Sequence, residues 1–391
     1  MDTSVDIKNI ILDKVYRKID INTVPDDGEL SDIIDEVIMD NCSNDLISVE
    51  EKIRYKTSIL NSIRGLDVIS ELLEDEEITE IMVNGYENIF IEKNGKLFKT
   101  DKKFSSEKRL FEIIQRIMSG TNRVVNETSP IVDTRLEDGS RVNIVLHPIS
   151  LRGSSISIRK FPKDTMTLSK LIEYKSINDQ VASFLKYIVK IKKNIFISGG
   201  TSSGKTSMLN ALSKMIPSDE RIITIEDSAE LCLDNIENLV SLEVRNANLE
   251  GENAISMREL IKTALRMRPN RIIVGEVRGE ETIEMLQAMN TGHSGSISTG
   301  HSNSCRDMIS RLETMVLMAM DIPISAVRKQ IASAIDIFIH LGKDNQGKRS
   351  MVEITEVRGI RNGDIVLEKL FERKEDKFIK VSEMKNIKEY D

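Results

Sequence analysis

One short stretch, "NIFISGGTSSGKTSMLNAL" over residues 194–212, limits what this chain can fold into more than any other. Its first residues are apolar and β-branched, which is typical of a buried strand, and its last residues have the apolar spacing of a helix. The glycines and serines between them fit neither pattern and indicate a tight loop. The stretch therefore predicts a strand, a loop and a helix in direct succession.

The loop has the spacing Gly199-x-x-x-x-Gly204-Lys205-Thr206, which is typical of loops that bind the phosphates of a nucleotide. Glycines let backbone N–H groups approach the phosphates, the lysine reaches the β- and γ-phosphates, and the Thr206 hydroxyl binds Mg²⁺. The alternative is a glycine turn that binds nothing, and the flanking strand and helix argue against it. The residues expected to bind ATP are Gly199, Gly200, Thr201, Ser202, Ser203, Gly204, Lys205, Thr206 and Ser207.

Strand-like and helix-like segments alternate through the C-terminal half of the chain. Short apolar runs such as "RIITIED", "RIIVGE" and "GSISTG" are separated by segments with helical spacing. This alternation predicts an α/β fold in which helices cover both faces of a mainly parallel sheet. Because ligands of such sheets bind beyond the carboxyl ends of the strands, residues that follow these runs are candidates for a site.

Apolar patterns also divide the chain into regions. Three segments with helical spacing predict a three-helix bundle over residues 1–63, and mixed helix and strand patterns predict a smaller α+β domain over residues 64–161. A linker is expected over residues 162–178. The α/β domain is expected over residues 179–391.

Acidic residues and histidines follow several of the predicted strands. Glu226 and Asp227 end one strand, and Glu276 ends another. Carboxylates at these positions hold Mg²⁺ and activate the water that attacks a phosphate, although a strand-end acid can also be a surface charge. His293 and His301 lie on either side of a short predicted strand, at a separation that fits no zinc site. We expect them to act near the phosphates, and polar loop residues without a function are the alternative.

Composition narrows the classes of function. No apolar run approaches the roughly 20 residues of a membrane span, and the N-terminus lacks the pattern of a signal peptide, so a cytoplasmic chain is expected. The spacing of the three cysteines favours free thiols over a structural metal site. A net charge of −8 and only 4% aromatic residues argue against a nucleic-acid surface.

Four ordered motifs, "GGTSSGKT", "ITIEDSAEL", "LRMRPNRIIVGEVRG" and "TGHSGSISTGHSNS", resemble those of the secretion and pilus-assembly ATPases of type II and type IV systems. Within that family the chain is similar to the CpaF-like ATPases of Tad/Flp pili, from about residue 65 onwards. The resemblance implies a RecA-like P-loop ATPase domain behind a smaller α+β N-domain, with ATP and Mg²⁺ as cofactors. It also implies a homohexamer that works on an inner-membrane platform protein from the cytoplasmic face of the membrane.

The same resemblance assigns roles to the candidate residues. Ser202 stands where the family usually has glycine, and we expect an altered rate with binding retained, provided its φ angle is ordinary. Mg²⁺ is assigned, directly or through water, to Thr206, Glu226 and Glu276. The remaining roles are Lys205 and Thr206 in the Walker A loop, Glu226 and Asp227 in an acidic box, Glu276 as the Walker B acid, and His293 and His301 in a histidine box.

Three arginines of the smaller domain are further candidates. Arg135 and Arg141 flank Asp138-Gly139, a tight-turn signal between two predicted strands, and Arg159 ends the domain. Exposed hairpin charges are the plain interpretation. The resemblance implies instead that this domain folds over the nucleotide of its own chain, where phosphoryl transfer gains from an added arginine. We therefore expect all three to act on the phosphates.

Three alternatives to a pilus or secretion motor remain. A conjugative type IV secretion ATPase has the same motifs. A RecA-like motor that moves nucleic acid has the same core, and the acidic composition argues against it. A scaffold that binds nucleotide without hydrolysing it is the third, and Glu276 argues against it.

Overall fold

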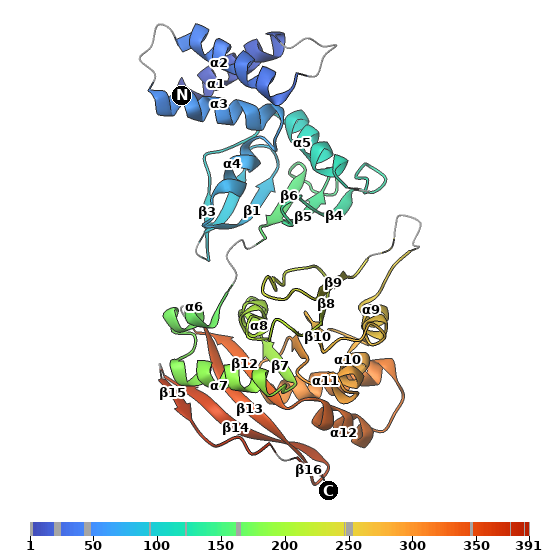
Figure 1. The fold of residues 1–391 in the computed structure, drawn as a ribbon. Coiled ribbons are helices and arrows are strands. Elements are labelled where there is room, and N and C mark those ends of the chain that lie inside the picture. Colours follow the sequence, from blue (N-terminus) through green and yellow to red (C-terminus); the bar gives the residue numbers. More distant parts are fainter. Residues whose placement is uncertain are drawn as a thin grey trace. The chain divides into compact units, whose positions relative to one another are not determined.

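The structure is a computed structural model that describes residues 3–18, 25–42, 48–93, 95–121, 123–161, 166–245, 247, 253–344, 347–375, 377–386 and 388–390 (Figure 1). Contacts divide the chain into two compact units, Met1–Lys163 and Asp164–Asp391. No helix in these described ranges is long and apolar enough to cross a membrane.

The first unit begins with three helices, as predicted: α1 (Thr3–Lys18), α2 (Asp27–Cys42) and α3 (Val49–Ile63). Their apolar stripes enclose a small core of their own. Ser48 fixes the start of α3, because its hydroxyl accepts from the Glu51 N–H while the Glu51 carboxylate accepts from the Ser48 N–H.

The first unit continues with an antiparallel sheet in the order β3-β2-β1-β6-β5-β4. The amphipathic helix α5 buries Leu110, Ile113, Ile114 and Ile117 in the core of this sheet. The expected hairpin at Asp138-Gly139 is present, with Gly139 at φ +84°. The elements are α4 (Val68–Glu74), β1 (Ile78–Asn84), β2 (Ile89–Lys93), β3 (Lys96–Lys99), α5 (Glu107–Ser119), β4 (Ile131–Arg135), β5 (Arg141–Val145) and β6 (Ser155–Arg159).

The second unit is built on a larger sheet in the order β15-β14-β13-β12-β7-β11-β10-β8-β9, and β16 pairs with β13. The strands from β12 to β9 run parallel, as predicted from the alternation, whereas β13, β14 and β15 add antiparallel pairs that we did not predict. The elements are α6 (Leu168–Glu173), α7 (Asp179–Lys190), β7 (Ile195–Gly199), α8 (Lys205–Ser213), β8 (Ile222–Glu226), β9 (Leu239–Glu243), α9 (Met257–Ala264), β10 (Arg271–Val274), α10 (Thr282–Asn290), β11 (Ile297–Gly300), α11 (Cys305–Ala319), α12 (Ile324–Ala334), β12 (Ile337–Lys343), β13 (Arg349–Arg361), β14 (Asp364–Lys374), β15 (Lys377–Lys380) and β16 (Glu389–Tyr390).

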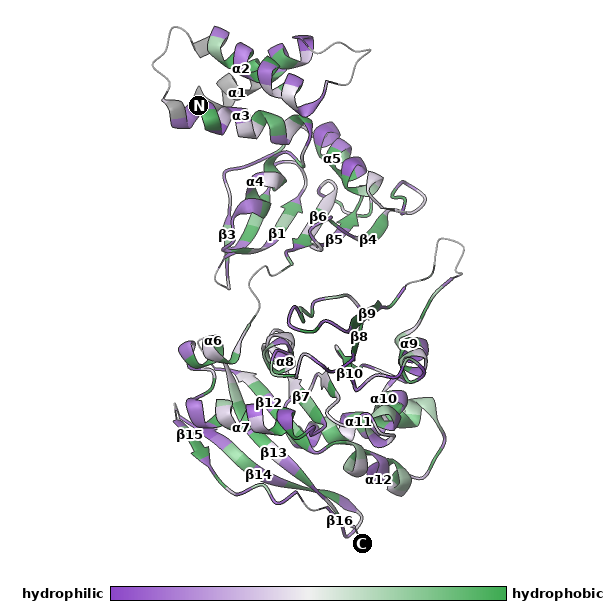
Figure 2. Ribbon diagram, viewed as in Figure 1, coloured by the Kyte–Doolittle hydropathy of each residue, from purple (hydrophilic) through white to green (hydrophobic). Residues whose placement is uncertain are grey.

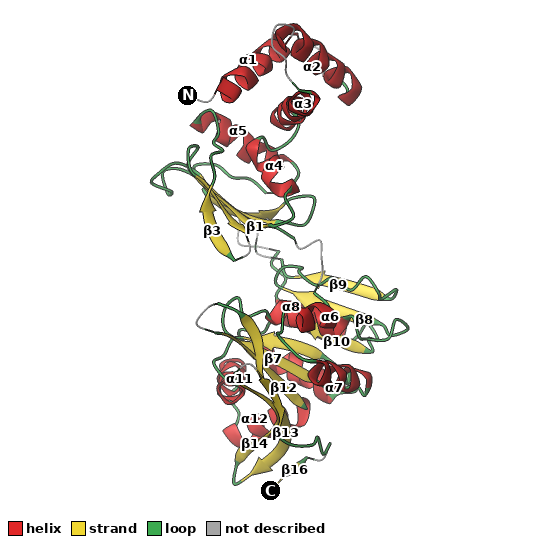
Figure 3. Ribbon diagram, turned by 90° about the vertical axis from the view of Figure 1, so that its left-hand side faces the viewer, coloured by secondary structure: helices red, strands yellow, loops and turns green. Residues whose placement is uncertain are grey.

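Two apolar cores lie on the two faces of this sheet. Ile195 and Ile197 of β7 pack with α6, α7 and α8, and the intervening Phe196 packs with α9 to α12. Successive side chains of a strand point to opposite faces, so a strand covered on both sides must be apolar throughout. The views show the same arrangement, with apolar central strands (Figure 2) and with α7 and α11 on opposite sides of β7 and β12 (Figure 3).

The linker expected over residues 162–178 is shorter in the structure. Residues 168–173 form α6, and Leu168 and Leu171 are buried in the core shared with α7 and α8. The apolar spacing within "TLSKLIEY" was the signal for this helix. Residues 162–165 lie outside the described ranges.

Buried polar side chains close the amino-terminal end of the parallel strands. Asn194, just before β7, donates to the carbonyls of Met289 and Ala334 and accepts from the N–H groups of Gly295 and Ser296. Four backbone groups from three segments are thereby held by one side chain.

A buried ion pair lies at the same end of the sheet. Arg271 at the start of β10 is 0% exposed, and its guanidinium makes two hydrogen bonds to Glu220, at 2.8 and 2.9 Å, and one to the carbonyl of Val189. Gly295 is at φ +86°, and a Cβ there would meet Arg271 Nη1 at 2.6 Å. This glycine is therefore required both for its backbone conformation and for the space that the arginine fills.

Candidate active site

The phosphate loop joins β7 to α8 as the sequence predicts. Gly204 precedes the helix at φ +97°, a conformation that favours glycine, and a Cβ at Gly199 would meet the Leu341 carbonyl at 2.6 Å. Nothing lies within 4 Å of the corresponding position at Gly200. Ser202 has φ +55°, so the condition under which we expected it to be tolerated is not met. A serine in this left-handed region carries strain of roughly 1 kcal/mol.

Lys205 is the first residue of α8 and is only 7% exposed. Its ammonium donates to the carbonyls of Gly199 at 3.2 Å and Gly200 at 3.1 Å, and it lies 3.1 Å from Nδ1 of His301. Burial lowers the pKa of Lys205, and the nearby carboxylate of Glu276 opposes that shift. The lysine is thus folded back onto its own loop.

His301 connects this lysine to the predicted Walker B acid. Its Nε2 lies 3.1 Å from Oε1 of Glu276, while Nδ1 faces Lys205. Burial, and then the positive charge of Lys205, lower the pKa of His301, which favours the neutral ring at pH 7. A neutral ring that accepts from Lys205 at Nδ1 donates its Nε2–H to Glu276.

The three residues follow three adjacent strands. Lys205 comes after β7, His301 after β11 and Glu276 after β10, and these strands are neighbours in the sheet. Their carboxyl ends lie at one edge because they are parallel. The structure therefore brings together residues that the chain separates by up to 96 positions.

Glu226 lies nearby, at the end of β8, and is only 4% exposed. Its Oε1 accepts from the N–H groups of Glu230 at 2.8 Å and Leu231 at 3.1 Å, so this carboxylate holds the following turn. Its role at a metal stays a prediction.

The donors present fit a cation that arrives with phosphates. Among the described residues, no group of three or more His, Cys, Asp or Glu side chains could hold a metal ion alone. Mg²⁺ is usually held by one or two carboxylates together with substrate phosphates and waters. Thr206 at the start of α8 and the carboxylate of Glu276 supply oxygen donors of the kind it prefers.

The structure does not bring His293 to this cluster. His293 precedes β11, whereas His301 follows it, so the two histidines lie at opposite ends of this strand. Nδ1 of His293 lies 3.3 Å from the carbonyl of Ala288. A strand separates the two histidines, so they cannot share one edge. A role for His293 near the phosphates stays a prediction.

The three arginines of the first unit form one row across adjacent strands. Arg135 of β4 pairs in register with Arg141 of β5, which pairs with Arg159 of β6. Residues in register point to the same face, and like charges in this arrangement are destabilising. Their action on the phosphates stays a prediction.

Arg278 is a site residue that the sequence analysis did not single out. Its Nε lies 3.1 Å from Oε1 of Glu276, and its Nη1 lies 3.7 Å from Oδ2 of Asp227. The signal was its position two residues after the Walker B acid, in "GEVRG".

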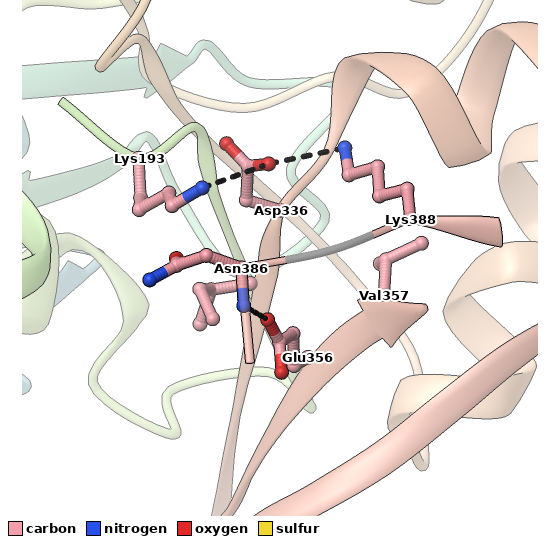
Figure 4. Close-up of a pocket in the computed structure, with 7 residues that line it drawn as sticks. Lys193, Asp336, Glu356, Val357, Asn386 and Lys388 are labelled. Carbon is pink, nitrogen blue, oxygen red and sulfur yellow. Dashed lines mark hydrogen bonds and ion pairs between the residues drawn. The ribbon is translucent and has the colours of Figure 1, made fainter. Parts of the chain in front are cut away.

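A cavity of about 270 Å³ lies elsewhere in the second unit, at the amino-terminal end of β7 and β12 (Figure 4). Its charged groups satisfy one another: Lys388 lies 3.0 Å and Lys193 lies 3.6 Å from Oδ1 of Asp336. Glu356 accepts from the N–H of Asn386 at 2.8 Å. This cavity is at the other end of the strands from the phosphate loop and takes no part in the site.

The sequence model of the type II/IV secretion system protein family matches residues 63–363. The chain belongs to this family. Its members include secretion ATPases, and the helices α1 to α3 precede the matched range almost entirely.

Similar proteins agree with this membership. The conjugal transfer protein TrbB of Rhizobium radiobacter is 30% identical over 318 residues, which cover 80% of this chain and 94% of TrbB. The type IV secretion system protein VirB11 of Brucella abortus is 30% identical over 336 residues, which cover 78% of this chain and 91% of VirB11. The X-ray structure of the ATPase DotB of Legionella pneumophila aligns with a TM-score of 0.53 at 23% identity, over 74% of this chain and 79% of DotB. This member of the secretion family thus has the predicted fold, a RecA-like P-loop ATPase domain preceded by a smaller α+β domain and a helical unit.

Proposed function

We propose that this chain is an ATP-hydrolysing motor of a Tad/Flp-type pilus or of type II/IV protein secretion. The observation that carries the proposal is the continuous contact from Lys205 through His301 to Glu276 beside the phosphate loop. This contact links Lys205, the cation expected to bind the phosphates, to Glu276, the carboxylate expected to activate the attacking water. Membership in the family of secretion ATPases supports the same activity.

Each residue then has one task. The N–H groups of the phosphate loop and the ammonium of Lys205 would hold the phosphates, which requires Lys205 to leave the carbonyls it now contacts. Glu276 would take up the proton of water, and His301 would keep its carboxylate in place. Bound Mg²⁺ would neutralise the developing charge.

The motor is proposed to act as a homohexamer at the cytoplasmic face of the membrane, through an inner-membrane platform protein. Heterologous contacts of identical subunits close into rings when the rotation allows it. We propose further that the arginine row reaches the phosphates of the nucleotide in its own chain when the two units close. Nucleic acid is not a proposed partner.

Two substitutions separate binding from turnover. Lys205→Ala removes the cation on the phosphates and should weaken ATP binding at least about tenfold, whereas Glu276→Gln keeps binding and should lower kcat at least about a hundredfold, because an amide cannot take up a proton. ATP affinity and kcat are measured for both. Glu280→Gln, at an exposed acid of the same segment, is the matched control. Near-normal turnover by Glu276→Gln would contradict the assignment.

A conjugative type IV secretion ATPase is the second candidate, because the relatives TrbB and VirB11 carry those names. Neighbouring genes distinguish the two: pilin-like subunits and a prepilin peptidase favour a pilus, and a relaxase with a coupling protein favours conjugation. Strong stimulation of ATP hydrolysis by single-stranded DNA would instead favour a nucleic-acid motor.

A further inference from the structure

Arg278 lies between two carboxylates at the catalytic edge of the sheet. One of its nitrogens is 3.1 Å from Glu276 and another is 3.7 Å from Asp227, at the ends of the paired parallel strands β10 and β8. The side chain is 65% exposed, so these ion pairs place it and packing does not. An arginine is always charged and offers several donors in a fixed plane, which suits contact with two acids.

The oxygen that Arg278 contacts is the one that His301 also contacts, Oε1 of Glu276. Arg278 therefore places a permanent positive charge directly against this carboxylate. The acids at this edge are therefore partnered by the protein's own cation.

Carboxylate oxygens are also the ligands that a divalent cation seeks. Arg278 and such a cation cannot both contact the same oxygens, and two cations close together repel. We propose that Arg278 is the resident counter-ion of Glu276 and Asp227, and that the divalent cation arriving with the nucleotide displaces it. This inference rests on the proposed function, since it takes the nucleotide to be ATP with Mg²⁺.

The counter-ion makes Mg²⁺ binding weaker than the two carboxylates alone would allow. An exposed ion pair contributes little free energy. Removing Arg278 should therefore lower the half-saturating Mg²⁺ concentration only about two- to fivefold. A merely structural arginine would not change this concentration, and an arginine that organises the carboxylates for the metal would raise it when removed.

The test measures binding of a fluorescent ATP analogue over a series of MgCl₂ concentrations. Arg278→Gln removes the charge and should bind at two- to fivefold lower Mg²⁺, whereas Arg278→Lys retains it and should behave as the unaltered protein. Arg258→Gln is the matched control, because Arg258 makes similar ion pairs to Glu280 at 3.2 Å and Glu284 at 2.8 Å in the same unit. It should leave the Mg²⁺ dependence unchanged.

The outcomes separate this inference from the proposed function. An unchanged or raised half-saturating concentration for Arg278→Gln overturns the counter-ion role while the protein still binds ATP. Failure of the unaltered protein to bind the analogue at any Mg²⁺ concentration overturns the proposed function and the inference together. An equal change of the half-saturating Mg²⁺ concentration in Arg278→Gln and Arg258→Gln would reveal a general charge effect, and it would also overturn the counter-ion role.

Discussion

Lys205 and Glu276, two charged groups beside the phosphate loop, both have partners within the chain. Lys205 contacts two loop carbonyls and His301, and Glu276 contacts His301 and Arg278. ATP binding is therefore an exchange of partners, and its measured affinity is the difference between two sets of contacts.

The phosphate loop requires glycine at some of its positions and not at others. Gly204→Ala places a side chain at φ +97° and should lower the free energy of unfolding by about 1–2 kcal/mol and weaken ATP binding. Gly200→Ala is the control, because its Cβ meets nothing within 4 Å and its φ is not positive. Urea unfolding of both variants without nucleotide measures the difference, and equal stability of the two would contradict the role of the backbone conformation.

The positions of residues after predicted strands identify part of this site, but they do not show where a long exposed side chain points. Lys205, Glu276 and His301 each follow a recognisable strand, so parallel topology alone brings them to one edge. Arg278 was missed because its role depends on which way a long exposed side chain turns. His293 was grouped with His301 because both lie in one short segment that resembles a histidine box, and spacing alone did not show that the strand between them leads to opposite edges of the sheet.

At the scale of elements, the parallel part of the sheet could be predicted because each strand is apolar on both faces. The strands β13, β14 and β15 mix charged and apolar residues, as in "RSMVEITEVRGIR", so their pattern does not separate a sheet edge from a loop. Helix α6 was not predicted because it has only 6 residues, too few for a clear helical spacing of apolar side chains.

The buried pair of Arg271 and Glu220 ties three elements together, and Arg271→Met should cost about 3–5 kcal/mol because it leaves a buried carboxylate without its main partner. Arg361→Met, at an ion pair of 3.6 Å between exposed side chains, should cost less than about 1 kcal/mol. Urea unfolding measures both, and a small loss for Arg271→Met would contradict the argument.

The pair also sets a pH dependence for that measurement. Burial raises the pKa of Glu220, but the hydrogen bonds and positive charges of Arg271 and Lys192 together outweigh burial and hold the pKa below its ordinary 4.5. A carboxyl with a lowered folded pKa stabilises the fold above its unfolded pKa and loses that contribution as pH falls through the folded value. The stability difference between the unaltered protein and Arg271→Met should therefore shrink below about pH 4.5.

At the scale of the whole molecule, the proposal that the arginine row of the first unit acts on the phosphates bound by the second unit can be tested by substitution. Arg141 is the middle residue of the row, with Arg135 and Arg159 on either side. Arg141→Ala should lower kcat at least about tenfold and change ATP affinity less. Arg152→Ala, at an exposed arginine of the same unit, is the control.

Mixed subunits decide in which chain the row acts. If Arg141 serves its own chain, Arg141→Ala mixed with Glu276→Gln should show no more turnover than the two variants separately, since no chain holds both groups. Recovery in the mixture would place the arginine across a subunit boundary. Unchanged turnover by Arg141→Ala alone would return the row to a set of hairpin charges.

The two ends of the central sheet differ in what can move. At the amino-terminal end, Asn194 and Arg271 hold several backbone segments through buried hydrogen bonds. At the other end, ion pairs hold Glu276 and can be exchanged. The contacts that can change partners therefore lie where the parallel strands end, and the tightly packed contacts lie where they begin. An exchange of partners at the phosphate loop would then leave the amino-terminal end of the sheet in place.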